Sequence, residues 1–157
     1  MRLKQVALLL LVLLVGAQFF RPSTAVQPVD RALGLAARTQ MPPHLSGLLE
    51  RSCRDCHSHD STWPWYSKVA PVSWWIAGHV NDGRRHFNYS TWGNLEPSKA
   101  SHALEEVCEV VEKGEMPPAS YLFVHTKARL SKEEARALCQ WTRVERERIA
   151  ASLPVGR

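Results

Sequence analysis

Two cysteines and a histidine form the string in this chain whose residue types and spacing point most directly to chemistry. Cys53 and Cys56 are three positions apart, and His57 follows at once. Two thiols at this spacing at a helix end can each add to a vinyl group on one edge of a haem, and the adjacent imidazole can coordinate the iron. The string therefore predicts one haem c, attached covalently through Cys53 and Cys56, with His57 as the proximal ligand.

Two other kinds of site use the same residue types. A redox pair of the thioredoxin type belongs in a βαβ context, and no strand pattern is visible in this sequence. A structural zinc site needs four ligands, of which Cys53, Cys56 and His59 supply three, and no second pair of metal ligands is evident. Haem attachment is the preferred interpretation, and both alternatives stay open.

The second axial ligand of such a haem has to come from elsewhere in the chain. Met116 is the leading candidate, because a complete predicted helix separates it from His57 and two prolines stiffen the loop that follows it. His79 is the main rival: it shares the apolar face of a predicted helix and is expected to point inward. His125, in the loop before the last helix, is a third candidate. The choice matters because Met/His ligation raises the reduction potential relative to bis-His ligation.

Apolar residues recur at helical spacing in four segments after the N-terminal region. The segments are 44–52, a helix begun by Pro71 and ended by Gly83, a helix through 104–111 ended by Gly114, and a last helix opened by a capping box of Ser131 and Glu134. Long loops are expected at 58–71 and 84–96, and no segment alternates as a strand does. The sequence therefore predicts an all-α domain with long loops.

The first 25 residues are typical of a targeting segment. Arg2 and Lys4 precede an apolar run over 6–20, and small residues follow at 23–25. A membrane-spanning helix needs about 20 apolar residues, so the run is marginal as a permanent anchor. We expect either a cleaved signal peptide or an uncleaved anchor of the inner membrane at 1–25, then a linker over 26–42 and a haem-binding domain over 43–150. Basic residues at the N-terminus keep that end in the cytoplasm, so the domain is expected in the periplasm or another extracytoplasmic space.

The charge balance first suggests a nucleic-acid or anionic-membrane partner. The chain has 20 basic and 15 acidic residues, a formal charge of +5. Three of the basic residues and none of the acidic ones lie in the first 25 positions, so the remaining part carries 17 and 15. Much of the excess positive charge therefore belongs to the targeting segment, and we expect no nucleic-acid partner. Membrane contact is expected through the N-terminal segment if it is uncleaved.

Several further strings make the chain resemble a bacterial family of haem-binding domains, small exported proteins related to c-type cytochromes. The matching strings are CRDCHS at 53–58, TWPWYS at 62–67, APVSW at 70–74 and GEMPP at 114–118, together with His79, Gly83, Arg84, Asn88, Tyr89, Ser90, Trp92, Tyr121, His125 and Trp141. The string QFFRP at 18–22 is similar to the end of the N-terminal anchor common in that family, which favours an uncleaved anchor. The resemblance covers residues 43–145.

The last third also resembles class I cytochromes c, with a Gly-x-Met-Pro loop followed by a helix that begins Leu-Ser-x-x-Glu. That resemblance implies that Met116 is the sixth iron ligand. The predicted fold is an all-α, cytochrome c-like helical haem domain, preceded by the N-terminal hydrophobic helix. The chain departs from that pattern in a long tryptophan-rich insertion between Ser58 and Glu96.

The aromatic residues of the insertion are expected to line the haem pocket. Indole N–H and phenol O–H groups can donate to haem propionates while their rings exclude water. The candidate wall residues are Trp63, Trp65, Tyr66, Trp74 and Trp92. Arg84 is the expected charged partner of a propionate, with Arg85 as the alternate. Simple core packing is the competing interpretation for each aromatic residue.

Cys108 and Cys139 lie outside the attachment string, on two predicted helices. In an oxidising compartment they can form a disulfide, and the alternative is two buried thiols that pack as small apolar residues. The preferred function is single-electron transfer by one haem c outside the cytoplasm, with unidentified redox partner proteins. The alternative is a haem enzyme or a gas- or redox-sensing module, peroxidase-like, with an open distal site under His79. No catalytic constellation accompanies the string, so catalysis is not required by the sequence.

Overall fold

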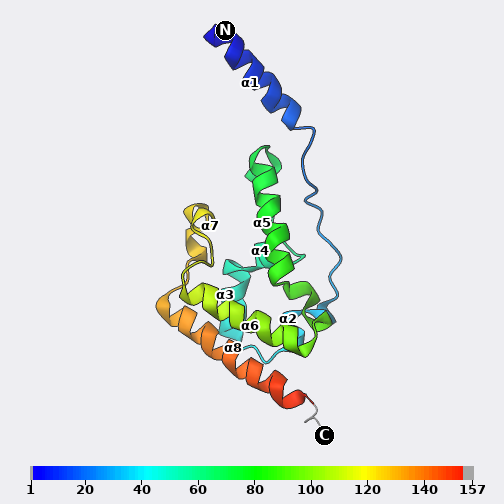
Figure 1. The fold of residues 1–157 in the computed structure, drawn as a ribbon, viewed down its shortest axis with the longest axis vertical. Coiled ribbons are helices and arrows are strands. Elements are labelled where there is room, and N and C mark those ends of the chain that lie inside the picture. Colours follow the sequence, from blue (N-terminus) through cyan, green and yellow to red (C-terminus); the bar gives the residue numbers. More distant parts are fainter. Residues whose placement is uncertain (1, 154–157) are drawn as a thin grey trace.

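Helices form all of the regular structure in residues 2–153, the part of the chain that this computed structural model describes (Figure 1). The α-helices are α1 (Leu3–Ala17), α2 (Leu35–Arg38), α3 (Pro43–Ser52), α4 (Arg54–His57), α5 (Val72–His86), α6 (Pro97–Glu112), α7 (Ala119–Val124) and α8 (Lys132–Ser152). Short 3-10 helices are η1 (Arg31–Leu33), η2 (Trp65–Lys68), η3 (Tyr89–Asn94) and η4 (Thr126–Ala128). The prediction of an all-α domain is confirmed.

Helices α6 and α8 pack along each other and form the base of the domain (Figure 1). The predicted capping box opens α8: the Ser131 hydroxyl accepts the backbone N–H of Glu134, whose carboxylate accepts the backbone N–H of Ser131. Gly114 follows α6 in the left-handed conformation, with φ of 71°, as expected for the residue that ends it. The core between these helices and α3 contains Leu45, Leu48, Leu49, Leu104, Leu138, Trp141 and Ile149.

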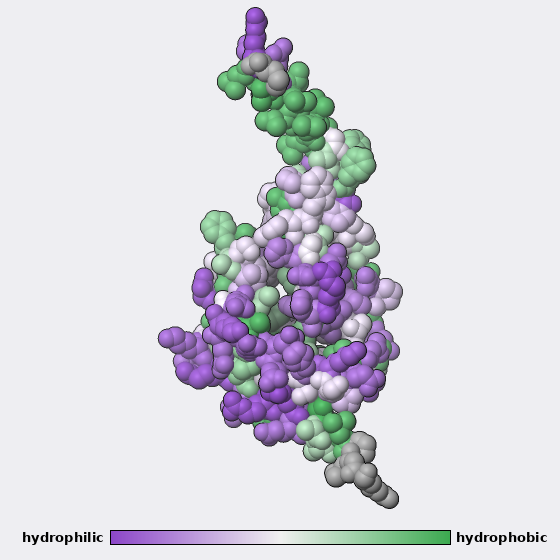
Figure 2. Space-filling model, in the orientation of Figure 1, coloured by the Kyte–Doolittle hydropathy of each residue, from purple (hydrophilic) through white to green (hydrophobic). Residues whose placement is uncertain are grey.

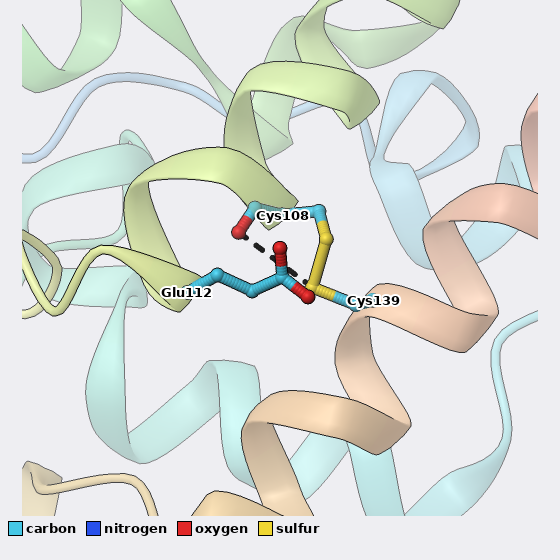
Figure 3. A group of neighbouring side chains, drawn as sticks. All are labelled: Cys108, Glu112 and Cys139. Atoms are coloured by element: carbon cyan, nitrogen blue, oxygen red, sulfur yellow. Dashed lines mark hydrogen bonds between the residues drawn. A yellow bond between two sulfur atoms is a disulfide. The ribbon is translucent and has the colours of Figure 1, made fainter.

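The two cysteines outside the attachment string join this helix pair. Cys108 on α6 and Cys139 on α8 form a disulfide, so the first of the two interpretations holds for them. Figure 3 shows the carboxylate of Glu112 directed toward the two sulfurs. A thiol must be a free thiolate to bind a metal, and both sulfurs are consumed in the disulfide, so this group is a covalent cross-link rather than a metal site.

Helix α5 rises away from the α6–α8 base and runs three residues beyond Gly83, to His86 (Figure 1). The prediction that Gly83 ends this helix is therefore wrong. The glycine is needed for a close approach instead: a Cβ added at Gly83 would lie 2.9 Å from the backbone oxygen of Cys56 and 3.3 Å from Cε1 of His57. The absence of a side chain lets α5 lie directly against the attachment string.

Part of the expected linker packs on the domain. Leu35 is buried in the hydrophobic core, and the indole N–H of Trp141 donates to the carbonyl of Gln40. A guanidinium N–H of Arg148 on α8 donates to the carbonyl of Arg38. Residues 35–41 are thus held against the hydrophobic core and α8, so the packed domain begins before the expected boundary at residue 43.

The N-terminal helix α1 stands apart from the base, at the top of the molecule (Figure 1), and is the most apolar part of the visible surface (Figure 2). It is 15 residues long, and none of its residues is buried. Among residues 2–153, no helix combines the length and the apolar character that crossing a membrane requires.

Candidate cofactor site

The attachment string lies at the junction of α3 and α4. Cys53 ends α3 and precedes the single turn of α4, which carries Cys56 and His57. Both cysteines are free thiols. Burial raises the pKa of each thiol to about 11, with the neighbouring charge of Asp55 adding to the effect at Cys56. Neither sulfur is poised as the thiolate that a thioredoxin-type exchange requires.

The ring of His57 is held in one orientation by the backbone that follows α5. Its Nδ1 lies 2.9 Å from the carbonyl oxygen of Phe87. A carbonyl can only accept a hydrogen bond, so Nδ1 carries the proton, and burial lowers the pKa of the imidazole and favours its neutral form. The lone pair is therefore on Nε2. This is the arrangement of a metal-binding histidine, whose other ring nitrogen donates to a carbonyl or carboxylate.

A cavity lies beside the string, between the start of α5 and the α7 region. Its walls include Cys56, Trp63, Tyr66, Val72, Trp75, Ile76, His79, Tyr121, Val124 and His125. Apolar and aromatic groups dominate this lining, as they do in cofactor sites generally. Cys53 and His57 lie outside the lining, so Cys56 is the cysteine of the string that opens directly onto the cavity, next to Asp55.

Only some of the aromatic residues expected to surround the haem line this cavity. Trp63 and Tyr66 line it, whereas Trp92 lies in the hydrophobic core against Phe87, with ring centroids 5.6 Å apart. Trp65 is 78% exposed, and the indole N–H of Trp74 donates to the carbonyl of Phe20 in the N-terminal segment. Core packing is thus the right interpretation for Trp92.

The indole nitrogen of Trp63 is buried and has no hydrogen-bond partner among the residues that the structure describes. An unpaired buried donor costs about 1–3 kcal/mol, so such groups normally have a partner in the working molecule. The donor belongs to a residue that lines the cavity, where an anionic group such as a haem propionate would accept from it. With the free thiols and the oriented imidazole, this donor set fits a covalently attached haem.

Arg84, the expected propionate partner, is engaged with the loop that follows the string. Its Nε donates to the carbonyl of Ser58 at 2.7 Å, and a terminal nitrogen donates to the hydroxyl of Ser61 at 2.9 Å. Ser61 in turn donates to the carbonyl of Asp55 at 2.6 Å. Arg84 therefore fixes the loop beside the attachment string, while its alternate Arg85 is exposed and pairs with Asp82.

The three candidates for the second axial ligand are placed differently. His79 is exposed toward the cavity rather than packed inward. The residues that share its helix face at helical spacing, Val72, Trp75 and Ile76, line the same cavity. Its Nδ1 lies 3.0 Å from the carbonyl oxygen of Trp75, so Nδ1 donates and Nε2 has the free lone pair. Met116 is 39% exposed and lines a separate hollow with Leu122 and Leu130.

His125 also lines the cavity, in a polar cluster that sequence reasoning missed. Its Nε2 lies 2.6 Å from the hydroxyl of Tyr66, and its ring stacks on Tyr121 with centroids 4.2 Å apart. The Tyr121 hydroxyl donates to Asp55, inside the attachment string, at 3.1 Å. The partners are 59 and 66 positions apart, so no local pattern in the sequence could have indicated them.

The fold and this site together define an all-α domain built to hold a haem. The chain belongs to the haem-binding domain family, whose sequence pattern matches residues 12–144. No curated protein and no solved structure matches the chain. Membership of this family therefore supports haem binding by the chain.

Proposed function

We propose that this haem-binding domain attaches one haem c covalently through Cys53 and Cys56 and carries single electrons outside the cytoplasm. The observation that carries the proposal is the imidazole of His57, which donates through Nδ1 to the carbonyl of Phe87 and leaves Nε2 as the metal-binding nitrogen. Two free thiols lie within four positions of it, and one of them opens onto an aromatic cavity. A bound haem supplies a one-electron Fe(III)/Fe(II) couple.

The residues around the cavity have separate tasks in this proposal. Trp63, whose buried indole N–H has no partner among the described residues, would donate it to an anionic edge of the cofactor. Tyr66 and Trp75 exclude water from the cavity, which tunes the reduction potential. Arg84 fixes the loop that follows the string and so limits movement of His57.

His79 is the side chain that the geometry favours as the distal ligand. It shares the cavity with Cys56, and its Nε2 is free because Nδ1 donates to the carbonyl of Trp75. Met116, the leading candidate from the sequence and the ligand implied by the resemblance to class I cytochromes c, is the competing candidate and lines a separate hollow. Bis-His ligation by His57 and His79 gives a lower potential than Met/His ligation.

The test is an anaerobic redox titration of the full chain produced in a bacterial periplasm. Electron transfer predicts a single one-electron wave and a six-coordinate, low-spin spectrum in both oxidation states. A high-spin spectrum, ready CO binding and turnover of peroxide would establish the haem-enzyme alternative instead. Fusing alkaline phosphatase to the C-terminus tests location separately, because that enzyme folds to its active form only where disulfides can form.

A further inference from the structure

The segment that follows α1 is bonded to the tip of α5 rather than hanging free. The side-chain amide of Gln18 pairs with the backbone of Ala70: its Nε2 donates to the carbonyl at 3.1 Å, and its Oε1 accepts the backbone N–H at 3.0 Å. Gln18 thereby satisfies both backbone groups of a buried residue 52 positions away. Such a paired contact fixes the orientation of the segment as well as its distance.

Two further bonds extend this contact on either side. The indole N–H of Trp74 donates to the carbonyl of Phe20, and the guanidinium of Arg21 donates to the carbonyl of Lys68 at 2.7 Å. The chain from α1 is therefore held at η2 and at the first turn of α5. Together these bonds form a clamp between residues 18–21 and residues 68–74.

Large apolar side chains surround the clamp and face outward. The exposed residues are Phe19, Phe20, Trp65, Val69, Val72 and Trp74, which we call the tip surface. In Figure 2 α1 is the most hydrophobic part, the adjoining tip of the domain is mostly of intermediate hydropathy, and the base is largely hydrophilic. Exposed tryptophan and phenylalanine at the end of an apolar helix are typical of the boundary between lipid headgroups and acyl chains.

The charges near the tip surface have one sign. No acidic residue occurs in the first 29 positions, nor between Asp60 and Asp82. Arg21 and Lys68 lie within the clamp. This distribution is complementary to an anionic lipid surface, where each basic residue near the headgroups contributes to binding.

We propose that the tip surface binds an anionic lipid bilayer beside α1, the membrane segment expected from the sequence, with Trp65 and Trp74 at the depth of the headgroups. The clamp fixes the tip of the domain relative to the end of α1, so the domain contacts the membrane in one orientation. Val72 belongs to the tip surface and also lines the aromatic cavity. The cavity is therefore held beside the membrane. This proposal does not depend on covalent haem attachment.

Photo-crosslinking to lipid tests the proposal on the full-length, haem-loaded chain. Vesicles of phosphatidylcholine and phosphatidylglycerol carry a lipid with a diazirine near the headgroup, and mass spectrometry maps the crosslinked peptides. We expect crosslinks on the peptides that contain Phe20, Trp65 and Trp74. The peptide with Val144, which is 57% exposed on α8 in the base of the domain, is expected to remain at background and serves as the internal control.

The clamp is tested by Gln18→Ala, with Gln27→Ala in the exposed linker as the matched control. Gln18→Ala is expected to lower crosslinking at Trp74 at least fivefold while crosslinking of α1 stays within twofold, and Gln27→Ala is expected to change neither. Background-level crosslinking at Trp65 and Trp74, or equal yields for both variants, would overturn the proposal. Crosslinks between protein copies at the tip surface, in place of lipid crosslinks, would identify a second copy of the chain as its occupant and overturn it too.

Discussion

The imidazole Nδ1 of His57 lies 2.9 Å from the backbone carbonyl oxygen of Phe87 and ties the attachment string to the end of α5. A backbone acceptor cannot be removed by a side-chain substitution at residue 87, so the orientation of the ring depends on where α5 ends and how closely it approaches α4. The close approach of α5 to α4 is consequently a condition for metal binding through Nε2 of His57.

Replacing Gly83 by alanine tests that proximity. The added Cβ would lie 2.9 Å from the backbone oxygen of Cys56, which cannot rotate away, so α4 and α5 must separate. We expect Gly83→Ala to lower the free energy of unfolding by about 1–3 kcal/mol, as overpacking does. Chemical denaturation followed by circular dichroism measures the change.

Gly78 on the same helix is the matched control, because a Cβ there meets nothing within 4 Å. Gly78→Ala is expected to stabilise the chain by up to about 1 kcal/mol through helix propensity alone. Equal effects at the two glycines would show that helix propensity decides both, and that α5 does not need its close approach to the string.

Replacing Trp63 by phenylalanine separates two roles of its side chain. A six-membered aromatic ring stays, but the unpaired indole N–H is lost together with the five-membered ring that carries it. We expect the haem-loaded chain to lose about 1–3 kcal/mol more stability than the haem-free chain, because the loss of packing is common to both forms and only the loaded form loses a donor to a charged group. Thermal unfolding of both forms is the measurement.

The exposed Trp65 provides the comparison for that experiment, since it lies outside the cavity lining. Trp65→Phe is expected to leave both forms unchanged within about 0.5 kcal/mol. If Trp63→Phe lowers the stability of both forms equally, the side chain acts through packing and donates nothing to the cofactor.

The Cys108–Cys139 disulfide is expected to stabilise the pairing of α6 with α8. It closes a loop of 31 residues, so replacing both cysteines by alanine should lower the free energy of unfolding by about 3–4 kcal/mol. Thiol titration of the unfolded holoprotein checks the pairing directly. We expect no reactive thiol before reduction and two afterwards, and two thiols before reduction would show that the disulfide is absent.

Alanine substitutions at His79 and Met116 decide the distal ligand. We expect His79→Ala to convert the low-spin spectrum to high-spin and to open the iron to CO, because a cavity-lining imidazole is lost. Met116→Ala is expected to leave the spectrum low-spin, since Met116 lines a separate hollow. The reverse pattern, with loss of a Met-to-iron charge-transfer band in Met116→Ala, would assign the ligand to Met116.

Local patterns in the sequence predicted the ends of helices correctly where one or two residues satisfy the backbone groups there. The capping box of Ser131 and Glu134 and the left-handed Gly114 both lie where expected, because each satisfies the backbone groups at a helix end. Gly83 was misassigned because a glycine that ends a helix and a glycine that admits a neighbouring backbone look the same in sequence. Only the position of the Cys56 carbonyl distinguishes them.

The surroundings of the site were harder to predict than its central string. The stripe that includes Trp75 and His79 has helical spacing, which indicates one face but not whether that face meets the core or a cavity. The contacts of His125 with Tyr66, and of Gln18 with Ala70, join residues more than 50 positions apart. These contacts arise from tertiary packing, so they cannot be predicted from residue propensities or from spacing along the sequence.

Covalent attachment of haem through Cys53 and Cys56 is the central claim, and the intact mass of the denatured chain tests it most directly. The full chain, produced in the periplasm and extracted with acidified acetone, is predicted to retain the mass of one haem, and the Cys53→Ala/Cys56→Ala variant to lose it. A chain that releases all of its haem to the solvent and shows two free thiols at these positions would contradict the account.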